Sequence, residues 1–460
     1  MNEEDIKKLI YQRYIEPTKQ KRDVYAGIEL ELPLINLDKA PLDFKLIHKL
    51  TEKFKTQFNF NVKTRDDDGN ICCLEDPKTD DIYTYDCSYN NLEISFGKEK
   101  NLHRVEERFR EYYKFIQETI NPENHYLTGF GVNPYRNYNK HLPVPNGRYR
   151  MLYNHLCTYS KYKYEKYFHD MPEYGMFTSA AQTQVDVNFH DLIKTIHLFS
   201  ILEPIKAVLF SNSVLNDGEM ELACSRDMLW EDSMQGYNKK NVGMYEPLPE
   251  TMDELLDYML STSIYCTEKD GKYINFPPRV ITDFYQAETI YGEYYQDGNY
   301  HPISFEPNGT DFKYLRSFKF EDLTFRGTLE FRSVCTQPVN ETMTVHSFHM
   351  GLINQLDELN QIFETDTNLY NQQYSLTELR NLMVRYELPD FVDKNQLQDL
   401  TVKILDLATQ GLKTRGYNEE KMLKPLYKRI KLLENPGQQL IKHLKSGGEI
   451  EDKIREYAQL

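Results

Sequence analysis

The sequence predicts an α+β protein that forms one integrated domain over residues 1–460. Several short segments alternate apolar and polar residues, as antiparallel strands with one buried face do. Longer segments place apolar residues three or four positions apart, as amphipathic helices do. The sequence contains no internal repeat of about 20–50 residues, so a solenoid is excluded. We therefore expect a sheet over about 24–335 and a helical C-terminal part over about 341–460.

The individual elements follow from these two periods. The expected helices, in chain order, lie at 2–15, 46–54 and 101–120, from about Arg148 onward, at 190–210, and beyond 341. The expected strands lie at 24–32, 90–96, 182–189 and 328–333. An Asp-Gly pair predicts a tight turn at 65–70, and a Pro- and Asn-rich loop fills 133–147. The Tyr-, Asp- and Gly-rich region at 214–320 predicts loops and short helices.

The charge balance limits the possible partners. The chain has 55 Lys and Arg against 71 Asp and Glu, a net charge of −16. Such a protein repels a phosphate backbone, so we expect no nucleic-acid partner. An anionic ligand would need a local cationic pocket or bound metal ions. No run of about 18 apolar residues occurs, so we expect no membrane partner.

The seven cysteines are odd in number and include no Cys-x-x-Cys pair. A disulfide framework and a structural zinc site are therefore not expected. The N-terminal segment has mixed charge and no apolar core of the kind found in signal peptides. We expect a cytoplasmic protein with reduced thiols.

Four expected strands carry an unusual polar face. Alternation places Glu and Asp, with a few Gln, Asn and Arg, opposite the apolar residues, and no Lys occurs on any of the four faces. The charged members of this set are Glu29, Glu31, Glu93, Asp186, Glu330 and Arg332. If the strands share a sheet, five carboxylates crowd one surface.

Two interpretations of this surface are open. Half-exposed antiparallel strands often carry solvated polar faces. Solvated faces usually mix Lys, Thr and Glu, however, and crowded carboxylates repel each other unless a cation is bound. Oxygen ligands select a hard cation such as Mg²⁺, which completes its shell with substrate phosphates. Arg332 could then contact the same phosphate, so the pattern favours a nucleotide–Mg²⁺ site.

Motifs of other nucleotide-binding and hydrolytic classes do not occur. The sequence has no Walker A loop, no Gly-x-Gly-x-x-Gly, no His-Glu-x-x-His and no Gly-x-Ser-x-Gly. P-loop, Rossmann, zincin and α/β-hydrolase assignments are therefore not supported.

Five segments resemble the glutamate–cysteine ligase family, most nearly its plant and proteobacterial type. In chain order they are GIELEL (27–32), PNGRYRMLYNHL (145–156), MFTSAAQTQVDVNF (176–189), AVLFSNSVLNDGEMELACSRDMLWED (207–232) and FRGTLEFRS (325–333). The resemblance implies an antiparallel sheet curved into a funnel, as in glutamine synthetase. It also implies an enzyme of glutathione biosynthesis that uses ATP and Mg²⁺. Such a ligase joins the γ-carboxylate of L-glutamate to the amine of L-cysteine through a γ-glutamyl phosphate.

The resemblance also implies roles for individual residues. Metal ligands would be Glu29, Glu31, Glu93 and Glu330, with Gln184 or Asp186 contributing. Catalytic residues would be Arg332, which contacts phosphate, together with Arg326 and Glu330. Glutamate would be bound by Arg226, Arg148 and Gln184, because Arg binds carboxylates bidentately. Trp230 and Tyr149 are expected in the core, whereas His155 and His301 could approach the site.

Two alternatives stay open. The regions 214–320 and 341–460 follow the family pattern only in general helical character, and they reach the part where the acceptor amine would bind. A related carboxylate–amine ligase with another amine acceptor is therefore the second hypothesis. A non-catalytic binding protein that kept the sheet is the third, and loss of a metal carboxylate would favour it.

Overall fold

A computed structural model describes residues 1–20, 23–158 and 168–460. Its main element is an antiparallel sheet that has nine strands within these residues. Eight strands follow the order β14-β15-β7-β1-β5-β4-β3-β2, and β6 pairs with the end of β1. The strands are β1 (Ala26–Asn36), β2 (Asn61–Arg65), β3 (Ile71–Glu75), β4 (Ile82–Tyr85), β5 (Asn91–Glu99), β6 (His125–Leu127), β7 (Ala181–Asp186), β14 (Glu321–Leu323) and β15 (Thr328–Phe331).

The four strands predicted from alternation lie side by side in the middle of this sheet. β15 pairs with β7, β7 with β1, and β1 with β5, all antiparallel. Ile28, Leu30 and Val185 are buried on one face of these strands. The Asp-Gly turn predicted at 65–70 is also confirmed, since it joins β2 to β3.

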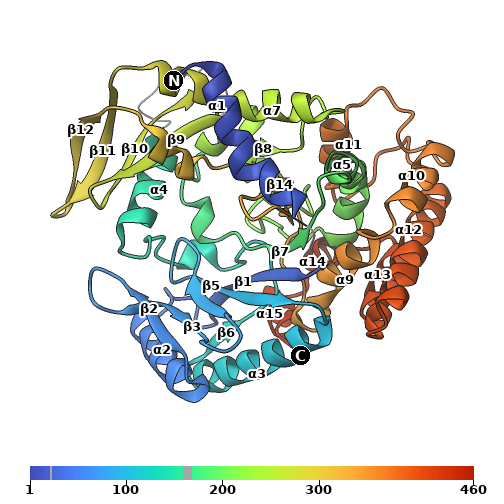
Figure 1. Cartoon of the computed structure of the whole chain (residues 1–460). Coiled ribbons are helices and arrows are strands. Elements are labelled where there is room, and N and C mark those ends of the chain that lie inside the picture. The colour runs from blue at the N-terminus through green and yellow to red at the C-terminus, as the bar shows by residue number, and fades with distance from the viewer. Residues whose placement is uncertain (21–22, 159–167) are drawn as a thin grey trace.

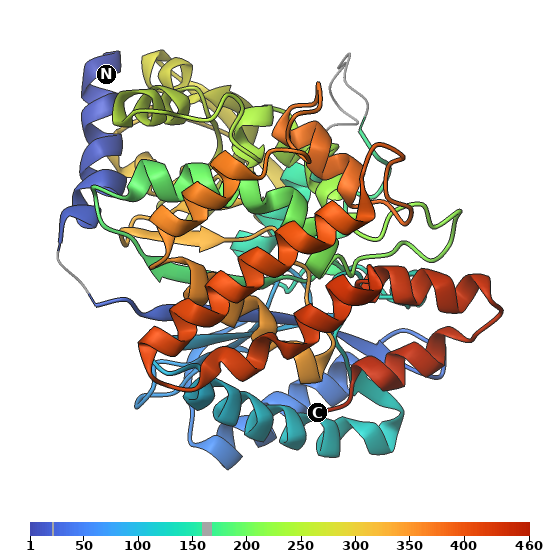
Figure 2. The same ribbon diagram turned by 90° about the vertical axis from the view of Figure 1, so that its right-hand side faces the viewer.

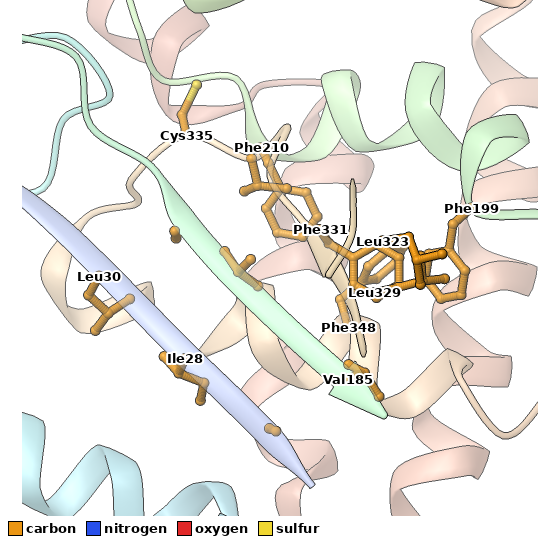
Figure 3. Close-up of a cluster of buried hydrophobic side chains, with 14 of the residues drawn as sticks. Ile28, Leu30, Val185, Phe199, Phe210, Leu323, Leu329, Phe331, Cys335 and Phe348 are labelled. Carbon is orange, nitrogen blue, oxygen red and sulfur yellow. The ribbon is translucent and has the colours of Figure 1, made fainter. Parts of the chain in front are cut away.

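Helices cover the apolar face of the sheet. α5 (Leu192–Phe210) and α9 (Met343–Leu352) lie against its β14, β15 and β7 side, where Phe199 and Phe348 meet Phe331 and Leu329 (Figure 3). α2 (Phe44–Phe58) and α3 (Leu102–Ile120) lie against its β3 and β5 side (Figure 1). These helices do not cover the opposite, polar face of the same strands.

The C-terminal part is helical, as predicted, and faces the viewer in Figure 2, where much of it packs against α5 and α9. Its helices are α10 (Leu356–Thr365), α11 (Leu376–Met383), α12 (Lys394–Arg415), α13 (Lys424–Leu432), α14 (Pro436–Lys445) and α15 (Ile450–Tyr457). α12 packs on α9 almost backbone to backbone, because a Cβ on Gly411 would lie 1.8 Å from the carbonyl oxygen of Gly351.

The region at 214–320 differs from the prediction of loops and short helices. It contains a second antiparallel sheet, ordered β12-β11-β10-β9, which projects at the upper left of Figure 1. Its strands are β9 (Ser263–Lys269), β10 (Lys272–Val280), β11 (Ile290–Gln296) and β12 (Asn299–Phe305). The alternation is hidden here because β11 and β12 expose polar and aromatic side chains on both faces, such as the adjacent Tyr300 and His301.

Smaller elements complete the molecule. α4 (Gly147–Cys157) packs on β10, and α1 (Glu3–Ile10) packs on α7 (Met252–Leu260). α1 continues as one π-helical turn over Tyr11–Ile15, so the predicted N-terminal helix is confirmed with a change of winding. Other short elements are α6 (Arg226–Glu231), α8 (Ile281–Gln286), β8 (Val242–Gly243) and β13 (Phe318–Lys319). Among the described helices, none combines the length and apolar character that a membrane crossing requires.

Candidate active site

The polar face of the main sheet forms the floor of a cavity of about 700 Å³. The opposite walls come from the N-terminal helical segment, α4, α6, α7 and the chain around β13 and β14. Arg13, Tyr149, Trp230 and Phe318 are among the residues that line these walls. Segments from the whole range 13–332 therefore meet around one space.

Strand register brings the floor residues into rows that run across the sheet. Each row consists of directly paired residues from neighbouring strands, whose side chains point to the same face. The first row is Cys73, Thr84, Glu93 and Glu31. The second is Ile82, Ser95, Glu29 and Gln182. The third is Asp322, Glu330, Gln184 and Gly27.

Gln184 connects two of the predicted carboxylates. Its Nε2 donates hydrogen bonds to Glu29 Oε1 at 3.1 Å and to Glu330 Oε1 at 3.3 Å. Arg326 Nη1 donates to Gln184 Oε1 at 3.4 Å, and Arg332 Nη1 lies 2.8 Å from Glu330 Oε2. Five residues expected in the site, Glu29, Gln184, Arg326, Glu330 and Arg332, thus form one connected polar group.

The other two predicted carboxylates of the floor, Glu31 and Glu93, lie farther along β1 and β5. Glu31 accepts hydrogen bonds from the Ala180 backbone N–H at 2.7 Å and from Gln182 Nε2 at 2.8 Å. Glu93, directly opposite Glu31, accepts one from Ser95 Oγ at 2.7 Å. The pairing of two acids at one register position is repulsive in the protein alone.

Burial first, and neighbouring acids second, raise the pKa values of three of these carboxyl groups. Burial raises the pKa of Glu29 well above its ordinary value, and the nearby Glu330 and Glu93 raise it further. Burial, Asp86 and Glu93 raise the pKa of Glu31 to about 8, and burial with Asp86 raises the pKa of Glu93 to about 7. The floor carries more negative charge than its neighbours compensate, so a bound cation would stabilise it.

These donors fit Mg²⁺, which prefers oxygen ligands and takes one or two carboxylates alongside phosphates and water. Within the described residues, no three His, Cys, Asp or Glu side chains already form a metal site. Among the other carboxylates of the floor, Glu330 and Glu93 raise the pKa of Glu29 the most. Glu29, Glu31, Glu93 and Glu330 are the residues that would hold such an ion.

The cavity also provides positive charge. Eight Arg or Lys residues and six Asp or Glu residues line it, in a chain whose net charge is −16. The cations are Arg13, Arg148, Arg226, Lys313, Arg316, Lys319, Arg326 and Arg332, and the acids are Glu29, Glu31, Asp86, Glu93, Asp322 and Glu330. This is the local cationic pocket that an anionic ligand of an acidic protein requires.

Arg226 and Arg148 lie in different parts of the lining. Arg226, at the start of α6, donates to the carbonyl oxygens of Ser333 at 3.2 Å and Arg332 at 3.3 Å, and its buried Nε has no hydrogen-bond partner. Arg148, near the start of α4, has a raised pKa because of the nearby Tyr149 first and of Asp86 and Glu93 after it. Each guanidinium keeps N–H groups for a ligand.

One predicted metal ligand lies outside the cavity. Asp186 ends β7, two residues beyond Gln184, and its Oδ2 accepts a hydrogen bond from the Tyr25 backbone N–H at 3.2 Å. The cavity lining contains every other predicted site residue. Alternation assigned Asp186 to the correct face, but it does not show where along the strand the site ends.

The aromatic and His expectations are also revised. Trp230 and Tyr149, expected in the core, line the cavity. His155 is buried outside the lining and stacks on Tyr265, whose centroid is 3.9 Å away, and His301 is exposed on β12. Sequence reasoning missed Asp86, Asp322 and Lys319, which lie outside the four conspicuous strands.

All seven cysteines are free thiols, in agreement with the expectation of no disulfide framework. Cys73 lies in the first row of the cavity floor. Cys224 and Cys335 have sulfurs 3.5 Å apart behind Arg226. Burial raises the pKa of Cys73 to about 11, which keeps this thiol protonated and a weak nucleophile.

The structure thus combines an antiparallel sheet, whose polar face carries clustered carboxylates, with arginines that line the same cavity. The chain belongs to the glutamate–cysteine ligase family 2, whose model matches residues 26–458. This places it in a family of ligases, in agreement with the resemblance carried by the five sequence segments.

Individual relatives are distant. The chain is 23% identical over 318 residues to glutamate–cysteine ligase A, chloroplastic, of Oryza sativa subsp. indica, which covers 65% of this chain and 57% of that protein. It is 23% identical over 323 residues to the chloroplastic glutamate–cysteine ligase of Arabidopsis thaliana, covering 65% and 54%. The match thus spans little more than half the length of these relatives.

A solved structure has a similar fold. The crystal structure of a glutamate–cysteine ligase from Francisella tularensis in complex with AMP superposes with a TM-score of 0.50 at 11% sequence identity, over 96% of this chain and 89% of that one. The mixed arrangement of helices and antiparallel sheet is therefore shared with that protein.

Proposed function

We propose that this protein is an ATP- and Mg²⁺-dependent ligase that joins the γ-carboxylate of L-glutamate to the amine of L-cysteine. The observation that carries the proposal is the connected group Glu29, Gln184, Glu330, Arg326 and Arg332 on the cavity floor. Family membership of the chain supports the same reaction. The products would be γ-glutamylcysteine, ADP and phosphate.

The roles of the residues follow from charge and position. Bound Mg²⁺ would neutralise phosphate charge and align the γ-phosphoryl group with the attacking carboxylate. Glu29, Glu31, Glu93 and Glu330 would hold it, and Asp186 could act only from beyond the cavity edge. Arg332 and Arg326 would contact the phosphoryl oxygens, where charge develops.

Substrate binding would use the other arginines. Arg226 would bind a glutamate carboxylate through the remaining N–H groups of Nη1 and Nη2, with Gln184 and Arg148 supporting. The γ-carboxylate oxygen would take the phosphoryl group from ATP, and ADP would leave. The amine nitrogen would then attack the acyl carbon and release phosphate. No covalent protein intermediate is needed, which agrees with a lining built from acids, arginines and aromatic side chains.

The larger organisation is part of the proposal. We propose that residues 1–460 act as one ligase unit in the cytoplasm. The largest buried apolar cluster extends from Ile6 to Ile430, and a second one joins Ile35 of β1 to Tyr457 of α15, which supports one unit. The free thiols are consistent with a reducing compartment. The cavity over the polar sheet face supports a funnel like that of glutamine synthetase.

The acceptor amine decides between the proposal and its alternative. ADP release should be measured with Mg²⁺, ATP and glutamate, adding each common amino acid or simple amine in turn, with the product identified by mass spectrometry. Strong stimulation by cysteine alone supports the proposal. Stimulation by a different amine replaces the product while keeping the metal and phosphate roles. No stimulation by any amine would overturn the ligase assignment.

A further inference from the structure

Arg380, on the C-terminal helix α11, is buried behind the cavity wall and uses every one of its hydrogen-bond donors. Its Nε donates to Asp227 Oδ2 at 2.8 Å and its Nη2 to Asp227 Oδ1 at 3.3 Å. Its Nη1 donates to Glu203 Oε2 at 2.5 Å and to the Glu203 carbonyl oxygen at 2.8 Å, and Nη2 also reaches the Ser333 carbonyl oxygen at 3.5 Å. A guanidinium has five N–H donors, and all five are engaged.

The partners of Arg380 are neighbours of residues that line the cavity. Asp227 follows Arg226 on α6, and Ser333 follows Arg332 after β15. The Ser333 carbonyl oxygen accepts hydrogen bonds from both Arg226 and Arg380. One buried side chain therefore holds together the two backbone segments that present the candidate glutamate and phosphate contacts.

Two further contacts strengthen this link. Ser333 Oγ donates to Glu203 Oε1 at 2.9 Å, so Ser333 is tied to the same carboxylate as Arg380. The Arg380 guanidinium lies 4.6 Å from the centre of the Phe320 ring, and the Phe320 carbonyl oxygen accepts the Arg332 backbone N–H at 2.9 Å. Phe320 lines the cavity, whereas Arg380 does not.

We propose that Arg380 is a positioning residue, which fixes Arg226 and Arg332 relative to each other for ligand binding. The inference deepens the proposed function and rests on it for the identity of the ligand. Lys could supply the charge, but its three donors on a single nitrogen cannot span Asp227, Glu203 and Ser333 as a planar fork does. The guanidinium geometry is therefore the property under test.

The test compares Arg380→Lys with Arg429→Lys. Arg429 is equally buried at 3% exposure and also lies on a C-terminal helix, but it binds the Leu209 carbonyl, Gln337 and Glu341, away from the cavity. Arg380→Lys should raise the KM for glutamate at least tenfold and lower kcat. Arg429→Lys should lower the Tm without changing either constant.

A spectroscopic signal reports the position of α6 without turnover. Trp230 is the only Trp of the chain, lies on α6, and packs on Phe318 and Tyr174. Its emission maximum should shift in Arg380→Lys and stay unchanged in Arg429→Lys. If the wild-type protein shows no glutamate-dependent ADP release, the proposed function fails. The shift of the Trp230 emission maximum in Arg380→Lys then still tests whether Arg380 positions α6.

Two results would overturn the inference. One is an Arg380→Lys protein whose KM, kcat and Trp230 emission match those of Arg429→Lys. The other applies if Arg380→Lys does not fold. Ser333→Ala then removes only the hydroxyl that bonds to Glu203, and it should raise the KM for glutamate at least threefold. An unchanged KM in folded Ser333→Ala would count against the inference.

Discussion

The guanidinium of Arg332 lies 2.8 Å from the carboxylate of Glu330, two residues earlier along the chain, and both side chains line the cavity. The pair joins a candidate metal ligand to a candidate phosphate contact on one segment. Glu330 also accepts a hydrogen bond from Gln184 and lies near Glu29. A change at Glu330 should therefore affect chemistry much more than folding.

Glu330→Gln should abolish ADP release and leave the Tm unchanged or higher. The variant removes a ligand charge, but it also removes the second cause, after burial, of the raised pKa of Glu29, which is repulsion from Glu330. Glu75→Gln is the control, since Glu75 lies on β3 of the same sheet, pairs with Lys63 and is outside the cavity. Normal ADP release in Glu330→Gln would refute the site assignment.

Arg226→Ala should raise the KM for glutamate far more than the KM for ATP. Arg226 lines the cavity, and Nη1 and Nη2 each keep an N–H beyond those that bond to the Ser333 and Arg332 carbonyl oxygens. Steady-state ADP release with each substrate varied in turn measures both constants. Arg136→Ala, which removes a buried Arg that bonds to Asn216 outside the cavity, should change neither constant. An equal rise for glutamate and ATP in Arg226→Ala would contradict a carboxylate role.

Removal of divalent cations should abolish ADP release, and Mg²⁺ should restore it. Mg²⁺ with a non-hydrolysable ATP analogue should also raise the Tm, because a ligand that binds only the folded protein adds about 2.7 kcal/mol at a hundredfold excess over its Kd. Glu29→Gln should reduce this Tm shift, whereas Glu75→Gln should keep it. A shift of equal size in both variants would exclude Glu29 as a contributor.

Lys319 should make stability depend on pH. It is 1% exposed, and burial lowers its pKa to about 7. The unfolded chain keeps this proton up to about pH 10, so folding releases a proton between these values. The free energy of unfolding should therefore rise with pH over this range, by at most about 1.4 kcal/mol per unit from this group.

Urea unfolding of the wild-type protein and of Lys319→Met, at pH values from about 7 to about 9, isolates this contribution. The Met variant should show the shallower rise of unfolding free energy with pH. Its absolute stability will also change, because Lys319 Nζ donates to the Val242 carbonyl oxygen at 2.8 Å and contacts Tyr258 Oη at 2.9 Å. Only the slope of the unfolding free energy against pH tests the prediction. Equal slopes for the two proteins would contradict the lowered pKa of Lys319.

Gly411→Ala should destabilise the protein even though Ala favours helices. Its Cβ would lie 1.8 Å from the Gly351 carbonyl oxygen, so α12 would have to move away from α9. Such overpacking typically costs about 1–3 kcal/mol. Gly218→Ala is the control, because nothing lies within 4 Å of the added Cβ, and its effect should stay within about 0.5 kcal/mol. Thermal unfolding of both variants makes the comparison.

The central sheet could be predicted from the sequence because its strands alternate. Each of the four strands has one face buried by helices and one face of acids and amides, so the period of two is plain at β1 and β5. The same reasoning missed β11 and β12, because both of their faces carry exposed polar and aromatic residues. A strand shows alternating apolar and polar residues in its sequence only when one of its two faces is buried.

The candidate site could be predicted only as far as the sheet floor. Register, which set the rows containing Glu31 with Glu93 and Glu330 with Gln184, depends on pairing between distant strands. The opposite walls come from segments such as α6 and the chain near Lys319, whose sequences show no period of two. Trp230 therefore seemed a core residue, because local sequence cannot show which buried surface faces a cavity.

The strand order has a consequence for synthesis of the protein. β1 ends at Asn36, its neighbour β5 begins at Asn91, but its other neighbour β7 begins only at Ala181, and β15 follows at Thr328. At about 5–20 residues per second, the ribosome needs roughly 7–30 s after β1 to produce β7. During that time one edge of a β1–β5 pair stays without its native strand. Until β7 is made, the backbone N–H and C=O groups along that edge of β1 have no native partner strand, so the acidic floor cannot yet form.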